Sequence, residues 1–182
     1  EDQASGELVI NGTGPSSPFT DLLLPAGQSF DSITLQNGAK VIAQGAIALT
    51  GRLALRGGAT LTHPSGSEAG LRITAARVEI EAGSAIDVTG RGYPGGSTGS
   101  FGDLGTTLGG VAGASRGHGG THGGAGGRYA GAPEDDPRPP YGDVRRPVAL
   151  GSGGGAWSGA GGAGGGALRL VAADAIVVEG AI

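Results

Sequence analysis

The chain has 182 residues, a formal net charge of −4, no cysteine and 42 glycines. Its length fits one domain, and the absence of cysteine excludes disulfides, thiolate catalysis and zinc ribbons. The weak negative charge offers no basic stripe for phosphates, and no apolar run approaches the ~20 residues that cross a bilayer. We therefore expect neither a nucleic-acid partner nor a membrane span.

The first segment, residues 1–30, matches no pattern that we can name and is expected to be an amino-terminal cap or entry segment. The given sequence does not open with a charged and then apolar leader. A chain that begins with glutamate instead of methionine leads us to expect a product of processing, or a piece of something longer.

Residues 31–89 carry short bursts in which apolar and polar residues alternate, the period of strands with one buried face. Three units align by hand: ITLQNGAKVIA from Ile33, LALRGGATLTH from Leu53 and VEIEAGSAIDV from Val78. The sixth residue of each unit is a glycine that suits a corner with positive φ: Gly38, Gly58 and Gly83. Strand repeats separated by 20 and 25 residues cannot close a core alone and must stack on one another. These residues are therefore expected to form rungs of a parallel β-helix.

A longer echo links the two ends of the glycine-rich part. LRITAARVEIEAGS from Leu71 is matched by LRLVAADAIVVEGA from Leu168, 97 residues later, and Gly83 is matched by Gly180. We expect these stretches to lie one above the other, so that residues 167–182 resume the coil and continue beyond the given chain. The fold class expected is all-β: a right-handed parallel β-helix (solenoid) with a long glycine-rich, partly polyproline-II-like insertion. The alternative is an antiparallel sandwich.

The insertion spans residues 90–166 and holds 29 of the 42 glycines. Order is expected in it because it contains every tyrosine and the one tryptophan, residues that linkers lack: Tyr93, Tyr129, Tyr141 and Trp157. Its glycines partly recur every third residue, at Gly117, Gly120, Gly123 and Gly126 and again at Gly159, Gly162 and Gly165. Because polyproline II has three residues per turn, this period predicts a bare edge that another backbone can approach.

Two histidines, His118 and His122, lie four residues apart in GHGGTHGGAGG. Seven glycines in eleven residues oppose a helix, and on an extended chain the rings would stand ~13 Å apart, too far for one metal ion. We expect no metal and no cofactor, and we expect both histidines to hydrogen-bond between glycine segments. The Gly-His-Gly of polygalacturonases is similar, but the motifs that accompany it there are absent here.

Charged residues offer two further candidates for chemistry. Asp135 and Asp136 stand with Glu134 in a proline-flanked segment, where a solvated loop is expected in preference to an acid–base pair. Arg72 and Arg77, with Glu79 and Glu81, take outward positions. They resemble the basic residue and the calcium-binding acidic residues of a polysaccharide lyase. Alternating charge on an exposed strand face explains them equally well.

The ordered string IDVTGRGYPGG, GGTHGGAGG, YGD, LGSGGG, GGAGGGALRLVA and IVVEGAI resembles a glycine-rich β-helix module of very large bacterial secreted and surface proteins, some adhesin-like and some Rhs-associated. The resemblance covers roughly residues 31–182 and implies an extracellular or cell-surface location. It carries over no catalytic residues. Packed glycine strands also resemble the receptor-binding tips of some phage tail fibres.

The function expected is that of a structural or adhesive scaffold, not an enzyme. Its ligand would be a glycan or a cell-surface protein, held by Tyr93, Tyr129, Tyr141 and Trp157 with Arg145 and Arg146. Rings that merely pin the insertion are an equally good explanation. The alternatives are a polysaccharide lyase or hydrolase, and a receptor-binding part of a phage tail fibre. At the carboxyl-terminal end we expect further rungs or a second subunit.

Overall fold

A computed structural model describes residues 6–24, 30–97, 104–115, 117–127, 139–143 and 145–182. The chain divides into two compact units. We call Glu1–His63, Leu71–Asp87 and Arg169–Ile182 the strand unit, and Pro64–Gly70 with Val88–Leu168 the glycine unit. The glycine unit therefore contains both the expected insertion and the short stretch 64–70, which the sequence placed among the rungs.

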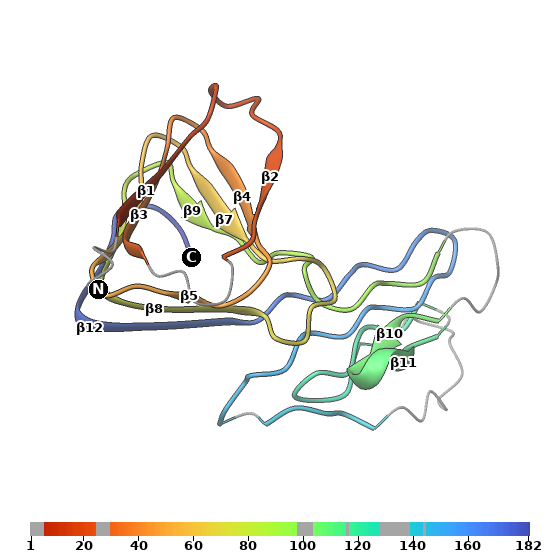
Figure 1. Cartoon of the computed structure of the whole chain (residues 1–182). Helices are drawn as coiled ribbons and strands as arrows, with labels where there is room; N and C mark the ends of the chain where they lie inside the picture. Colours follow the sequence, from red (N-terminus) through yellow and green to blue (C-terminus); the bar gives the residue numbers. More distant parts are fainter. Residues whose placement is uncertain (1–5, 25–29, 98–103, 116, 128–138, 144) are drawn as a thin grey trace. The chain divides into compact units, whose positions relative to one another are not determined.

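The described strands of the strand unit form two parallel sheets between which the chain alternates (Figure 1). The first has the order β1-β3-β6-β8-β12, with β5 also paired to β8: β1 Gly6–Asn11, β3 Phe30–Gln36, β5 Ile47–Ala48, β6 Arg52–Leu55, β8 Leu71–Ile80 and β12 Leu168–Val178. The second has the order β2-β4-β7-β9: β2 Phe19–Leu22, β4 Lys40–Ala43, β7 Thr60–Thr62 and β9 Ala85–Ile86. The described residues are thus mostly β, with parallel sheets and no α-helix.

The three repeats stack in the register that the sequence predicts. Ile33 pairs with Leu53 and Leu53 pairs with Val78, and all three side chains are completely buried. The shared corner glycines all have positive φ: +72° at Gly38, +79° at Gly58 and +79° at Gly83. An alanine would be strained at those corners, whereas the aliphatic residues form continuous columns through the core.

The strand that follows the insertion lies where the echo predicts, because β12 is hydrogen-bonded beside β8. The constant offset of 97 residues is wrong in detail. Ala85 pairs with Ala181, an offset of 96, so Gly180 does not take the place of Gly83, and Gly180 has no positive φ. The corner before Ala181 is shorter than the corner before Ala85, and the register shifts to accommodate it.

The glycine unit contains little regular secondary structure. Strands β10 Thr106–Thr107 and β11 Val111–Ala112 pair antiparallel around a short 3-10 turn, Leu108–Gly110. The rest of its described backbone consists mainly of extended glycine-rich segments and turns (Figure 1). No helix among the described residues of the chain is long and apolar enough to cross a membrane.

Candidate functional site

Three glycine segments, 92–96, 151–155 and 161–165, form the centre of the glycine unit. Each segment hydrogen-bonds to both of the others, and the bonds recur every third residue. The pairs, given as amide to carbonyl, are Tyr93 to Gly151, Gly96 to Gly154, Gly151 to Gly165, Gly154 to Gly162, Gly161 to Gly96 and Gly164 to Tyr93, all at 2.8–2.9 Å. Backbone groups that would otherwise be buried without partners are thereby satisfied by neighbouring backbone.

This arrangement leaves no room for side chains at particular glycines. A Cβ at Gly161 would overlap the carbonyl of Gly154, and one at Gly164 would overlap the carbonyl of Gly151. At Gly159, Gly162 and Gly165, which the sequence suggested as the bare edge, a Cβ would meet nothing within 4 Å. The period of three is correct, but its phase is wrong by one residue in this run, so the close approach falls on glycines that the sequence analysis did not select.

In the first glycine run the selected positions divide into two kinds. A Cβ at Gly120 would overlap Ser152, and one at Gly126 would overlap the carbonyl of Gly119. Gly117 and Gly123 instead have positive φ, +74° and +71°. Both kinds exclude larger residues, the first through crowding and the second through backbone conformation.

The histidines of this run are held by different partners. His118 is buried, its Nδ1 lies 2.6 Å from the carbonyl oxygen of Ser115, and its own carbonyl accepts the amide of Gly155. The ring of His122 packs edge-on against Tyr141, with centroids 5.1 Å apart and planes at 74°. No group of three His, Cys, Asp or Glu side chains in the described part of the chain is placed to hold a metal ion.

The described aromatic residues differ strongly in exposure. Tyr93 is only 3% exposed and Tyr141 is half-buried, whereas Trp157 is 38% exposed. The hydroxyl of Tyr141 donates to the carbonyl of Leu150 at 2.6 Å, and burial raises its pKa above the ordinary value. Tyr129 lies outside the described residues. Of the tyrosine and tryptophan side chains that the structure describes, Trp157 is the most exposed.

Tyr93 is fixed by the segment 64–70. Its hydroxyl donates to Glu68 Oε1 at 2.6 Å, and the amide of Gly109 donates to both the hydroxyl and Glu68 Oε1 at 3.3 Å. Burial, and next the hydrogen bond to Glu68, raise the pKa of Tyr93 to about 12. The ring therefore joins three separate segments of the glycine unit, and no signal in the sequence pointed to Glu68.

We expect this contact to appear in an alkaline titration. Because the folded pKa of Tyr93 lies above the unfolded value of 10.0, the stabilisation is complete below pH 10 and is lost as pH rises toward 12. Because the pKa of Tyr141 is raised as well, the titration should be made in the Tyr141→Phe variant. Absorbance at the tyrosinate band should then show one tyrosine ionising about two pH units late, and adding Tyr93→Phe should remove that step. A late step that survives in the double variant would contradict the assignment.

Arg145 and Arg146 lie on a tight turn with Asp143. The amide of Arg145 donates to Asp143 Oδ1 at 2.8 Å, and the amide of Arg146 donates to the Asp143 carbonyl at 3.1 Å. Both arginine side chains are exposed. The acidic residues of the neighbouring segment, 134–136, lie outside the described residues.

The outward charges of the strand unit form ion pairs across β6 and β8. Glu79 lies 2.5 Å from Arg77, 3.5 Å from Arg56 and 3.8 Å from Arg52, and Arg56 also lies 3.1 Å from Glu81. The hydrogen bond from Arg77, supported by the positive charges of the three arginines, lowers the pKa of Glu79. The carboxylates of Glu79 and Glu81 are thus paired with arginine side chains, as is typical of an exposed strand face with alternating charge.

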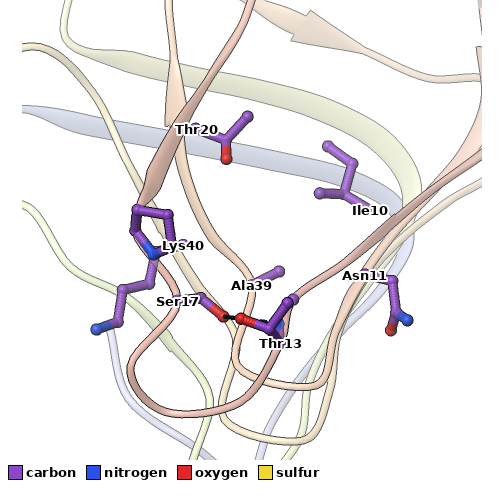
Figure 2. Close-up of a pocket in the computed structure, with 9 residues that line it drawn as sticks. Ile10, Asn11, Thr13, Ser17, Thr20, Ala39 and Lys40 are labelled. Carbon is purple, nitrogen blue, oxygen red and sulfur yellow. Dashed lines mark hydrogen bonds between the residues drawn. The ribbon is translucent and has the colours of Figure 1, made fainter.

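A small cavity of about 170 Å³ lies in the strand unit beside the start of β2 and β4 (Figure 2). It is lined by Ile10, Asn11, Gly12, Thr13, Ser17, Pro18, Thr20, Ala39 and Lys40. The Thr13 and Ser17 hydroxyls lie 3.3 Å apart, and Ser17 Oγ donates to the Gly14 carbonyl at 2.7 Å. These hydroxyls stabilise the corner after β1, and the lining holds no arrangement of acid, base and nucleophile.

Comparison of the chain with protein-family models, with curated proteins and with solved structures found no match.

Proposed function

We propose that this chain is an extracellular structural scaffold segment with an adhesive surface. The observation that carries the proposal is the continuous stacking of buried aliphatic residues, such as Leu35, Leu55 and Ile80, between neighbouring parallel strands. Such columns suit a stiff element that grows by adding strands and that needs no enclosed site. In the strand unit we infer a right-handed parallel β-helix, the hand that parallel crossovers adopt almost always.

For the glycine unit we infer a bundle of polyproline-II-like segments. The hydrogen bonds of 92–96, 151–155 and 161–165 repeat with a period of three, which matches three residues per turn. A regular strand would repeat every second residue. A bundle of this kind presents a surface made largely of backbone and methyl groups, which is rigid because each segment is bonded to two others.

The adhesive role rests on the exposed groups of the glycine unit. Trp157 is 38% exposed, and Arg145 and Arg146 are exposed with their backbone fixed by Asp143. An aromatic face with guanidinium groups on the same unit suits a glycan or a surface protein. The resemblance to bacterial surface modules supports a location outside the cell. We do not assign catalysis to any residue.

Binding to arrays of bacterial and host polysaccharides and of surface proteins tests this proposal. We expect Trp157→Ala to weaken binding about tenfold or more, the loss typical of an exposed aromatic anchor. Val148→Ala is the matched control, because Val148 is an exposed apolar residue of the same unit, at 70%. Arg145→Ala with Arg146→Ala should weaken binding in a way that depends on salt.

Two results would contradict the proposal. Equal loss of binding in Trp157→Ala and Val148→Ala would show that Trp157 is not part of a specific adhesive surface. Release of new reducing ends or unsaturated products from pectin or a related polymer would show an enzyme acting on polysaccharide instead of a scaffold.

A further inference from the structure

The two edges of the first sheet, β1 and β12, leave the ends of the aliphatic columns uncovered. In the middle of the sheet Leu53 and Leu55 are completely buried. On β12 Ile176 is 46% exposed and Val178 is 43% exposed. Large apolar residues on an edge strand, next to unpaired backbone groups, are a template for pairing with another strand.

The register at β12 follows from one hydrogen bond. Leu55 pairs with Ile80, and there the amide of Glu81 donates to the Leu55 carbonyl. The amide of Glu179 donates to the Ile80 carbonyl at 2.8 Å in the same way, which puts Val178 beside Ile80. Ile176 then lies beside Val78, and Val177 faces outward, where it lines a shallow cavity with Glu79 and Glu81.

The opposite edge carries the matching start of the same columns. On β1, Leu8 pairs with Ile33 and Ile10 pairs with Leu35, and both β1 side chains are only partly buried. One column is therefore Leu8, Ile33, Leu53, Val78 and Ile176, and the other is Ile10, Leu35, Leu55, Ile80 and Val178. Each column begins and ends with an aliphatic residue that is not fully covered.

The second sheet has uncovered ends in the same places. Its first strand exposes Phe19 (47%) and Thr20, while at the other end Ala181 pairs with Ala85 and Ile182 is 61% exposed. Thr20 pairs with Val41, Val41 with Leu61 and Leu61 with Ile86, the neighbour of Ala85. A further strand that paired with Ala181 and Ile182 would continue this second sheet as well.

We propose that the occupant of the β12 edge is a second copy of this chain, stacked head to tail so that its β1 and β2 continue both sheets. Continuing the columns sets Leu8 of the second copy over Ile176 and Ile10 over Val178, so aliphatic residues meet aliphatic residues. On the outer face, the same register places the side-chain amide of Asn11 of the second copy beside the carboxylate of Glu179 of the first. A hydrogen-bond donor then lies opposite an acceptor. Glu7 falls over Ala175, so no like charges oppose each other there.

The stacking is parallel, and it joins two different edges. Such a contact is heterologous, so that a stack of any length keeps a free β1 edge at one end and a free β12 edge at the other, and assembly continues into a filament. A twofold pair of β12 edges would end at two copies. This inference stands on the strand pairing alone and does not depend on the adhesive role.

Two edge variants of the 182-residue chain test the proposal by sedimentation equilibrium and light scattering. Leu8→Lys charges the aliphatic column at the β1 edge and Ile176→Lys charges it at the β12 edge, and both positions are only partly buried, so the folded unit can accept lysine. Val148→Lys, at 70% exposure in the glycine unit, is the control for added charge. Circular dichroism and thermal unfolding establish that each variant is folded.

We expect the unsubstituted chain and Val148→Lys to form species whose mass rises with concentration, beyond a dimer. Each edge variant alone should be a monomer, with association weakened about tenfold or more. An equimolar mixture of the two edge variants should give a dimer and nothing larger, since one intact β1 edge then meets one intact β12 edge. A chain that stays monomeric at all concentrations, a chain that stops at dimers, or a folded Leu8→Lys that still self-associates would each overturn the proposal.

Discussion

Replacement of Gly164 by alanine is expected to disrupt the glycine unit, whereas replacement of its neighbour Gly165 is expected to leave the unit intact. A Cβ at Gly164 would overlap the carbonyl of Gly151, and backbone cannot move aside as the tip of a side chain can. Inserting one carbon into a closely packed site typically costs about 1–3 kcal/mol of the free energy of unfolding. Here two hydrogen bonds of the same residue, to Tyr93 and from Gly92, are lost as well, so we expect the upper part of that range.

Gly165→Ala is the control, because alanine is expected to raise the stability there instead of lowering it. A Cβ at Gly165 meets nothing within 4 Å, and the residue has no positive φ. Alanine reduces the conformational freedom of the unfolded chain, which stabilises a protein by about 0.4–1 kcal/mol where the native backbone accepts it. Gly161→Ala and Gly162→Ala repeat the same contrast one turn away.

Intrinsic fluorescence measures this unit selectively, because all three tyrosines and the tryptophan lie between residues 90 and 166. Denaturant unfolding followed by fluorescence should show a loss of stability in Gly164→Ala and Gly161→Ala, and none in Gly165→Ala and Gly162→Ala. If all four variants lost the same stability, a general preference for glycine in flexible backbone would explain the segment, and the close packing of 92–96, 151–155 and 161–165 would be wrong.

The strand unit could be predicted from the sequence because its signal is carried by side chains. The alternation of apolar and polar residues around Ile33, Leu53 and Val78 fixes which face is buried. A shift of one residue in the pairing of two strands would expose every aliphatic side chain of the shifted strand to solvent. Burial therefore determines the register, and the observed pairs agree with the aligned repeats. At β12 the echo of 97 residues would place Ala175 beside Val78, whereas the hydrogen bond from Glu179 to Ile80 places Ile176 there, so the offset differed from the sequence echo.

The glycine unit could be predicted only in outline, because a glycine carries no side chain that distinguishes inside from outside. The period of three is visible in the sequence, but Gly161 and Gly162 differ only in which of them faces a neighbouring backbone. That choice is set by the backbone segments that lie alongside: Gly161 faces the carbonyl of Gly154 and hydrogen-bonds to Gly96, and neither segment carries side chains that mark the contact in the sequence. The contact of Tyr93 with Glu68 was equally invisible, since residues 64–70 precede the insertion in the chain.

Leu53→Ala is expected to be among the most damaging substitutions in the strand unit. Leu53 is 0% exposed and lies between Ile33 and Val78 in the middle of an aliphatic column, so alanine leaves a cavity that two neighbouring strands border. Backbone hydrogen bonds hold those strands in place, so the cavity cannot collapse readily. Leucine-to-alanine changes in such sites lower the free energy of unfolding by about 2–5 kcal/mol.

The loss should be measured by far-UV circular dichroism, because the strand unit contains most of the strands and none of the tyrosine or tryptophan side chains. Leu23→Ala is the matched control, since Leu23 belongs to the same unit but is 71% exposed, and a change within about 0.5 kcal/mol is expected there. A loss below ~1 kcal/mol in Leu53→Ala would mean that the column is not closely packed. In that case stacked aliphatic residues would not be what holds successive strands together, and both the scaffold and its extension by a second copy would lose their physical basis.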